Sequence, residues 1–492
     1  MQKISIDPIT RLEGHGKIDI FLNDEGDVAN AYLIIPELRG FEKFAEGRPV
    51  EEMPRITPRI CGVCPEAHHM ASAKACDAVY HVEVPPTGKM LRELLYSAFY
   101  AADHTVHFYI LAAPDFVLGP DAPVAERNIL GLIHKVGLDV GGQVIASRGK
   151  AMDIVGMLGG KTIHPVGAIP GGVSKAINEE ERAQIEAWGH ELVDFGLFSL
   201  QLFKDVVLAN QTYLDMILSD AYTTPMYYMG MVDDNNKVNF YDGQVRVVDP
   251  EGNEFVKYSP QEYLDVVAEH VEPWTYLKFP YLKKVGWKGF TTGKDSGVYQ
   301  ATPLSRLNAA DGMATPRAQE AYEEFYSTMG GKPVHGTLAT HWARLIELLY
   351  AAERLVELAT HPEITNPHVR AIPTETPTEG VGIVEAPRGT LTHHFVTDER
   401  GIVKKANLIV GTTNNYAPIS ISIKKAAQAM IQKGEVISEG ILNRVEMAFR
   451  SYDPCFGCAT HNLPGQMPLE LRIRDAQGNV LDVLTQHLDD NA

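Results

Sequence analysis

Hydrophobic and polar residues follow helical spacing through much of the chain. Between 91 and 113, the segment LRELLYSAFYAADHTVHFYILAA places apolar residues three and four positions apart, which predicts a helix with one buried face. The same spacing predicts further helices at about 125–158, 178–219, 260–270, 314–329, 337–360, 417–433 and 438–450. Several of these segments are long, so helices are expected to form most of the core.

Strands are predicted near both ends of the chain and in two internal segments. Residues 17–35, KIDIFLNDEGDVANAYLII, alternate between apolar and polar around the turn NDEGD, as a hairpin does. Comparable patterns occur in NKVNFYDGQVRVVDPEGNEFVKY, VGIVEAPRGTLTHHFVTDERGIVKKANLIV and MPLELRIRDAQGNVLDVL. No internal repeat or low-complexity linker divides the chain. The expected fold class is therefore α+β and helix-dominated.

Composition and charge narrow the class of protein. The chain has 492 residues, of which 45% are hydrophobic, and a formal net charge of -19. Such an acidic balance argues against a nucleic-acid partner, which requires a basic face. No stretch has the length of apolar residues that a membrane helix needs, and MQKISIDPITRLEGHG lacks the pattern of a signal peptide. We expect a soluble globular protein without direct membrane insertion.

The cysteines carry the clearest chemical signal. Of the five cysteines, four form two C-x-x-C pairs, in RICGVCPEAHH (59–69) and DPCFGCATH (453–461). A single pair of this kind can be a zinc half-site, a redox dithiol or a coincidence. Two pairs can supply four thiolates to one soft or borderline metal. Because they lie near opposite ends of the chain, unlike the closely spaced pairs of zinc fingers, we expect a deep site with a chemical role.

Several motifs together resemble those of the large subunit of nickel-iron hydrogenases. They span the whole chain and include the two cysteine motifs, PITRLEGH (8–15), RGFEKF (39–44), AADHTVHFY (101–109), HPVGAIPGG (164–172) and EAPRG (385–389). The resemblance is greatest to the cytoplasmic multisubunit branch. It implies the large-subunit fold, with long core helices and peripheral hairpins, and reversible heterolytic cleavage of H2 into protons and electrons.

The resemblance also implies a bimetallic site. By the family pattern, Cys61 and Cys455 are terminal ligands of nickel, whereas Cys64 and Cys458 bridge nickel to an iron that carries carbon monoxide and cyanide. Thiolate donors suit this chemistry because they stabilise the higher oxidation states of nickel. The sequence cannot encode the diatomic ligands, so maturation proteins are implied.

Further roles follow from the resemblance for polar residues around the cluster. A proton from H2 is expected to pass from Cys455 to Glu13. The other residues expected near the metals are Arg388 above the open site, Asp103 and Asp453 in a polar canopy, His68 beside a sulfur or cyanide, and Thr412 and Thr413 as donors to cyanide. Without the resemblance, Glu13 would be interpreted as a solvated residue, Asp103 as an arginine-paired helix residue and Arg388 as a turn residue.

The resemblance predicts a second ion and a removable tail. Glu42 and His461 are expected to hold magnesium or a second iron. A maturation endopeptidase is expected to cut just after His461, so that 1–461 forms a single catalytic domain and 462–492 is an extension. The alternative is that MPLELRIRDAQGNVLDVL forms an ordinary edge hairpin that is retained.

The remaining cysteine predicts a partner chain. Once four cysteines bind the metals, Cys76 alone is left, and we interpret it as a buried inert thiol. The chain then cannot hold a conventional iron-sulfur cluster, so electrons are expected to leave through an iron-sulfur small subunit. Flavin-containing diaphorase-type or heterodisulfide-reductase-type subunits are expected beyond it. No G-x-G-x-x-G fingerprint occurs, so no nucleotide site is expected on this chain, and the expected location is the cytoplasm.

Two other classes of protein are alternatives. A large-subunit-like component of an electron-transfer complex such as respiratory complex I shares the fold without the metals, but it lacks the cysteine pairs that are present here. A zinc-stabilised scaffold would use the same four thiols for structure. Metal analysis distinguishes the second alternative, because a scaffold would contain zinc and no nickel.

Overall fold

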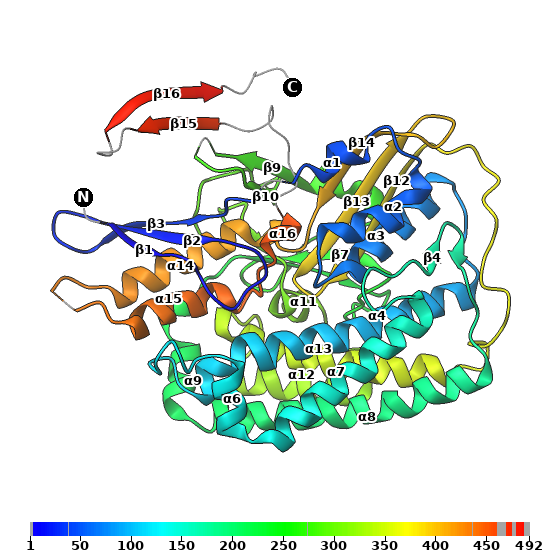
Figure 1. The fold of residues 1–492 in the computed structure, drawn as a ribbon, viewed down its shortest axis with the longest axis horizontal. Helices are drawn as coiled ribbons and strands as arrows, with labels where there is room; N and C mark the ends of the chain where they lie inside the picture. The colour runs from blue at the N-terminus through cyan, green and yellow to red at the C-terminus, as the bar shows by residue number, and fades with distance from the viewer. Residues whose placement is uncertain are drawn as a thin grey trace.

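A computed structural model describes residues 3–37, 39–272, 274–434, 436–459, 469–474 and 479–486. Long helices form one side of the molecule, and most of the sheets lie on the other (Figure 1). At the centre of the helical side, α13 (Thr340–Ala359) contacts α4 (Pro86–Val106), α8 (Glu179–Phe203) and α12 (Pro316–Met329), and α4 also contacts α7 (Leu138–Gly159). The helix-dominated α+β class expected from the sequence is confirmed.

Shorter helices connect these layers. The α-helices are α1 (Phe41–Ala45), α2 (Met53–Ile56), α3 (Pro65–Val79), α5 (Ala113–Val117), α6 (Ile129–Val136), α9 (Gln211–Leu218), α10 (Tyr263–Val266), α11 (Pro303–Ala309), α14 (Tyr416–Met430), α15 (Glu439–Arg450) and α16 (Phe456–Ala459). The 3-10 helices are η1 (Val50–Glu52), η2 (Thr57–Ile60), η5 (Asp220–Tyr222), η6 (Pro260–Glu262), η7 (Thr337–Ala339) and η8 (Thr413–Asn415). The π-helical turns are η3 (His107–Ala112) and η4 (Lys204–Leu208).

The strands form small sheets. A three-stranded sheet has the order β1 (Lys3–Ile6), β2 (Lys17–Leu22) and β3 (Val28–Ile34), and another has the order β12 (Glu379–Ala386), β13 (Gly389–Thr397) and β14 (Val403–Ile409). A four-stranded sheet has the order β11 (Tyr299–Gln300), β6 (Tyr227–Val232), β7 (Gln244–Val248) and β8 (Glu254–Tyr258). The two-stranded pairs are β4 (Ala168–Ile169) with β5 (Gly172–Val173), β9 (Val267–Val271) with β10 (Lys278–Leu282), and β15 (Leu469–Arg474) with β16 (Val480–Gln486).

The structure corrects the sequence prediction in three helical segments. The segment 125–158 contains two helices, α6 and α7, which are separated at Gly137, and 178–219 contains α8, η4 and α9. The helix expected over 260–270 is wrong in its second half, because residues 267–271 form β9 and pair with β10. Strand β6 was not predicted, since all six residues of YYMGMV are buried and show no alternation between apolar and polar positions. The expected hairpin in the tail is present as β15 and β16, while removal of 462–492 stays a prediction. Among the described residues, no helix is long and apolar enough to cross a membrane.

Two glycines let a strand lie directly on the helix that follows the first cysteine pair. A Cβ atom at Gly382 in β12 would stand 2.1 Å from the carbonyl oxygen of Ala71 and 2.4 Å from the nitrogen of Ala75, both in α3. At Gly380 the added atom would lie 2.4 Å from Val79 N. Because α3 begins one residue after Cys64, this contact fixes the position of the first cysteine pair.

Replacing Gly382 by alanine is therefore expected to destabilise the protein by about 1–3 kcal/mol, since two backbones would have to separate. The matched control is Gly142→Ala on the exposed side of α7, where an added Cβ meets nothing within 4 Å. That change should be neutral or stabilising by up to about 1 kcal/mol, because alanine favours the helix. Thermal unfolding measures both. Equal midpoints for the two variants would contradict the close packing of β12 on α3.

Candidate metal centre

The four paired cysteines meet in the interior of the protein. Their sulfur atoms all lie within 4.8 Å of one another, and all four residues are buried. The Sγ atoms of Cys61 and Cys455 are 3.3 Å apart, as are those of Cys64 and Cys458. All are free thiols. The expectation that the two distant motifs form one deep site is confirmed in its geometry, and four convergent thiolates form a donor set suited to a soft or borderline metal.

Cys61 and Cys64 lie in the segment between η2 and α3. Cys61 follows η2 in an extended conformation, and Cys64 immediately precedes α3, which has Pro65 at its first position. Proline suits that position because its missing N–H would have no partner within the helix. The backbone N–H groups of Val63 and Cys64 lie 3.1 and 3.2 Å from Cys61 Sγ and donate to it. These donors favour the thiolate form that binds metals.

The second pair is held against the N-terminal segment. Cys455 forms an isolated parallel bridge with Glu13, and Phe456 N donates to Glu13 O at 3.1 Å. The Cys455 thiol donates to Glu13 Oε2 at 2.9 Å, and Gly457 N donates to the same oxygen at 3.0 Å. A Cβ atom at Gly457 would stand 2.7 Å from Glu13 Oε1, so a larger residue there would displace the carboxylate from its present position.

Glu13 is not the solvated residue that composition alone would suggest. Burial raises the pKa of its carboxyl group, and the neighbouring Cys61 acts in the same direction. The hydrogen bonds from Cys455 and Gly457 oppose this shift. A carboxyl group with a raised pKa in contact with a cluster sulfur is placed to accept a proton from that sulfur and to release it again.

A buried arginine lies between two carboxylates beside the cluster. Arg388 is 3% exposed, and its Nη1 donates to Asp103 Oδ2 at 3.1 Å. Its Nη2 lies 2.9 Å from Asp453 Oδ2. The thiols of Cys64 and Cys455 are near enough to contribute to raising the pKa of Arg388. The structure thus joins three residues that the sequence placed together, and it also bears out the arginine pairing of Asp103.

The two threonines have different environments. Thr412 Oγ1 accepts a hydrogen bond from the backbone nitrogen of Cys455 at 3.1 Å, so it positions that cysteine. The hydroxyl of Thr413 is buried and has no hydrogen-bond partner among the described residues. A buried donor without a partner is costly, which is consistent with a ligand accepting from it. This hydroxyl and the four thiols fit a metal group that carries hydrogen-bond acceptors.

The two histidines of the first motif differ as well. His68 is fully buried, and its Nδ1 lies 3.1 Å from Nε2 of His393, whose Nδ1 lies 2.7 Å from Ser72 Oγ. His69 has a structural role: its Nδ1 donates to Pro54 O at 2.6 Å, and its Nε2 accepts from Ala168 N at 2.9 Å. The two bonds explain why His69 is neutral, and burial lowers its pKa to about 4.

Only one of the two residues expected at a second ion can be placed. Glu42 Oε1 accepts a hydrogen bond from Leu408 N at 2.8 Å, which brings Glu42 to the segment ANLIVGTT. His461 lies outside the described residues. The remaining cysteine, Cys76, is buried and its thiol donates to Val50 O at 3.1 Å, as expected for an inert thiol, and burial raises its pKa well above the usual value.

Some residues of the site were not found from the sequence. Arg39 donates from Nη1 to the carbonyls of Ile60, 2.6 Å away, and Gly457, 3.2 Å away, so it ties the two cysteine motifs together. Arg344 lies 3.4 Å from Asp453 Oδ2 and is fully buried. Arg39 lies within RGFEKF, one of the motifs that carry the resemblance, but no role was predicted for it. Nothing in the sequence marks Arg344 or His393.

The fold and the four-thiol site define the large subunit of a nickel-iron hydrogenase. The family model described as nickel-dependent hydrogenase matches residues 39–129 and 143–461, and a second model, described as HoxL-like, matches residues 3–38. The chain belongs to the nickel-dependent hydrogenase family. This membership confirms the resemblance seen in the sequence and the enzyme class, and the cluster of four cysteines fits a nickel-iron site.

Similar proteins come from multisubunit hydrogenases. The chain is 52% identical over 484 residues to the iron-sulfur subunit of the F420-non-reducing hydrogenase of Archaeoglobus profundus, covering 98% of this chain and 99% of that protein. It is 37% identical over 496 residues to the NAD-reducing hydrogenase HoxS subunit beta of Cupriavidus necator, with the same shares covered. A crystal structure of an NAD+-reducing NiFe hydrogenase in the H2-reduced state matches with a TM-score of 0.88 and 36% identity, covering 94% of this chain and 100% of that one.

Proposed function

We propose that this protein catalyses the reversible cleavage of H2 into two protons and two electrons at the four-cysteine site, and that it works with other subunits. The observation that carries the proposal is the contact between the Cys455 thiol and Glu13 Oε2, at 2.9 Å, inside a cluster of four buried sulfurs. A metal-binding sulfur in contact with a buried carboxyl group joins the two functions that heterolytic cleavage needs, a metal site and a proton acceptor.

The four cysteines would hold the metals in two roles. We assign Cys61 and Cys455 to nickel alone, and Cys64 and Cys458 to both nickel and an iron with carbon monoxide and cyanide ligands. The hydroxyl of Thr413 suits an acceptor such as cyanide, whereas Thr412 is occupied by Cys455 N. When bound, such a metal pair supplies an open coordination position that polarises H2 and takes up its electrons.

Residues of this chain then handle the proton and orient the site. The Cys455 sulfur receives a proton released from H2, and the Glu13 carboxylate accepts it across their 2.9 Å contact. The guanidinium of Arg388, held by Asp103 and Asp453, keeps a fixed positive charge beside the sulfurs. His68, linked to His393, is assigned a place beside a cluster sulfur or cyanide.

A second ion and a cleaved tail complete the proposal. Glu42 and His461 would hold magnesium or a second iron, because a carboxylate is a ligand that suits a hard ion. The hydrogen bond from Leu408 N orients the carboxylate of Glu42. We infer that an endopeptidase removes 462–492 after metal insertion, leaving 1–461 as one catalytic domain.

Electrons would leave through a partner chain. With four cysteines at the metals and Cys76 bonded to Val50 O, we assign the iron-sulfur clusters to a small subunit rather than to this chain. The relatives are named as subunits of F420-non-reducing and NAD-reducing hydrogenases, which supports the presence of further subunits. We assign these to the heterodisulfide-reductase type or the flavin-containing type, and the complex to the cytoplasm. Any nucleotide would then bind to a partner.

Purification of the intact complex tests this function. We expect nickel to co-purify, partner chains to co-elute, and H2 to drive the reduction of an artificial dye. Reduction of NAD or of a deazaflavin, measured beside the dye, identifies the acceptor class. A fully matured complex that contains zinc instead of nickel and reduces no dye would favour the scaffold alternative.

A further inference from the structure

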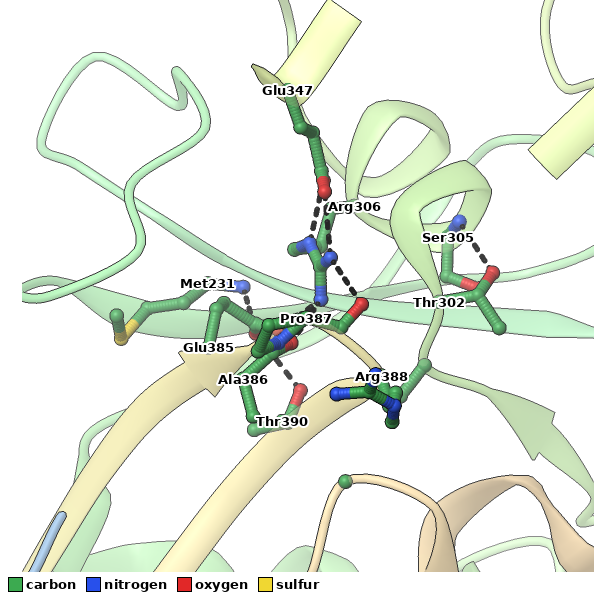
Figure 2. Close-up of polar contacts among 12 residues, drawn as sticks. Met231, Thr302, Ser305, Arg306, Glu347, Glu385, Ala386, Pro387, Arg388 and Thr390 are labelled. Atoms are coloured by element: carbon green, nitrogen blue, oxygen red, sulfur yellow. Dashed lines mark hydrogen bonds and ion pairs between the residues drawn. The ribbon is translucent and has the colours of Figure 1, made fainter. Parts of the chain in front are cut away.

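A buried arginine holds the turn between β12 and β13. The guanidinium of Arg306, on α11, has five N–H groups, and each has a partner (Figure 2). Two donate to the carboxylate oxygens of Glu347, at 2.6 and 2.7 Å, and one donates to Glu385 Oε2 at 3.0 Å. The other two donate to the backbone carbonyls of Ala386, at 2.9 Å, and Pro387, at 3.1 Å.

This turn carries Arg388. Ala386 pairs with Gly389 across the hairpin, so Pro387 and Arg388 form the connection between the strands. Gly389 has a φ of 147°, and a Cβ atom there would stand 2.4 Å from Ala301 O. Since the turn lies so close to another backbone, a small shift of its carbonyls changes where the Arg388 side chain points.

Side chains hold the other carbonyls of the turn as well. The hydroxyls of Tyr96 and Tyr100 donate to Glu385 O at 2.5 and 2.8 Å, and Asn415 Nδ2 donates to Arg388 O at 2.7 Å. Together with Arg306, they give each carbonyl from Glu385 to Arg388 a side-chain donor. The backbone before and at Arg388 is therefore fixed without relying on the ladder of the hairpin.

Glu385 links the turn to the neighbouring sheet. Its Oε1 accepts from Met231 N in β6 and from Thr390 Oγ1, both at 2.8 Å. A Cβ atom at Gly230 would stand 2.7 Å from the Cα atom of Arg306, so β6 packs directly on the arginine. Packing therefore confines the Arg306 side chain to one position, between α13, β6 and the turn that joins β12 to β13.

Stability alone does not account for this arrangement. Arg306, Glu347 and Glu385 are all fully buried. Removing three charges from water costs free energy that their attraction repays only in part, and apolar side chains of similar volume often stabilise as well. What apolar side chains could not do is hold two adjacent carbonyls in fixed directions. The forked, planar guanidinium can, whereas a lysine ammonium cannot bridge the same set of acceptors.

We propose that Arg306 is a positioning residue, which fixes the Arg388 guanidinium beside the four cysteines by holding the carbonyls of Ala386 and Pro387. It acts through Arg388 and touches no reacting atom. The inference rests on the role proposed above for Arg388, and it adds that the direction of that side chain is set from the opposite side of the turn.

The test compares Arg306→Lys with Arg92→Lys in the intact complex. Arg92 is a matched control, because it is also fully buried, donates to a carboxylate, that of Asp77, and donates to the backbone carbonyls of Ile169 and Gly172. Both variants should lose thermal stability. Only Arg306→Lys should lower H2-driven dye reduction, by about 100-fold, the effect of a misplacement of about 1 Å. It should also shift the infrared bands of carbon monoxide and cyanide, while its nickel content equals that of Arg92→Lys.

A double-mutant cycle with Arg388→Lys separates positioning from general damage. If Arg306 acts through Arg388, Arg306→Lys adds little loss in the Arg388→Lys background, whereas independent effects multiply. The inference would be overturned if the losses of activity from Arg306→Lys and Arg388→Lys multiplied in the double variant. It would also be overturned if Arg306→Lys had the same infrared bands and rates as Arg92→Lys. Neither result would affect the proposed function. Full activity of Arg388→Lys would instead remove the proposed role of Arg388 and, with it, that of Arg306.

A milder change covers the case in which Arg306→Lys does not assemble. Thr390→Val removes one hydroxyl donor to Glu385 Oε1 and leaves the charges of Arg306 and Glu385 in place. The inference expects the infrared bands of this variant to shift in the wild-type background but not in the Arg388→Lys background. Bands that stay unchanged in both would overturn it.

Discussion

Replacing Cys455 by alanine is expected to abolish nickel binding and to reduce H2-driven dye reduction to the background rate. The cluster would keep three sulfurs, and the contact that links it to Glu13 would be lost. The Glu13 carboxylate lies beside this position but is a hard oxygen donor, so it does not replace the missing thiolate at a site built from four soft donors. Metal analysis of the purified complex and dye reduction under H2 measure the two effects.

The matched control is Cys76→Ala. Cys76 is buried like the four ligands, but its thiol donates to Val50 O and lies outside the cluster. This change should keep nickel and activity and cost about 1 kcal/mol of stability, the value of one hydrogen bond. Retention of stoichiometric nickel by Cys455→Ala, or its loss from folded Cys76→Ala, would contradict the assignment of the ligands.

The change of Glu13 to glutamine is expected to lower H2-driven dye reduction by about 10²- to 10⁴-fold, the usual contribution of a positioned acid–base group. A glutamine has the same size and can still accept from Gly457 N, so the cluster should assemble with normal nickel content. Without a carboxyl group, however, a proton on Cys455 has no acceptor at 2.9 Å. Exchange between D2 and solvent protons should fall with the dye rate.

A suitable control is Glu37→Gln. Glu37 lies in the same N-terminal region, but its carboxylate pairs with the ring and backbone nitrogen of His15 instead of a cysteine. Its replacement should leave exchange and dye reduction within about twofold of the original, as for most surface changes. If Glu13→Gln behaved like Glu37→Gln, the proton would have to leave by another group.

Much of the fold could be predicted where a segment has a regular local pattern, such as two strands joined by a turn or apolar residues at helical spacing. The hairpins of β2 with β3 and of β12 with β13 follow patterns visible in the sequence, and long helices such as α13 show apolar spacing. β6 was not predicted because all of its residues are buried, so apolar and polar residues do not alternate along it. The error at 267–271 arose because pairing with β10 outweighed local apolar spacing.

The candidate site divides in a similar way. The paired cysteines could be proposed from their spacing, whereas Glu13 and Arg388 could be proposed only because their motifs resemble those of the hydrogenase family. Two other roles could not be predicted: the hydrogen bond of Thr412 with the Cys455 backbone, and that of Arg306 with the carbonyl of Pro387. In each case the two residues are far apart in the sequence. An isolated threonine or a helix arginine has many possible partners, and only packing selects one.

By itself, the sequence determined the set of donors, four cysteines in two pairs. The class of protein came from the resemblance of its motifs to those of a known family. The sequence determined the donors because a thiol, a carboxyl group or a guanidinium has the same chemistry wherever the chain places it. The tertiary structure alone decided that all four sulfurs lie within 4.8 Å, that Glu13 contacts Cys455, and that Arg306 holds the turn of Arg388. Those distances result from the packing of α3, β12 and the segments around Glu13 and Cys455 on one another, which no local pattern specifies.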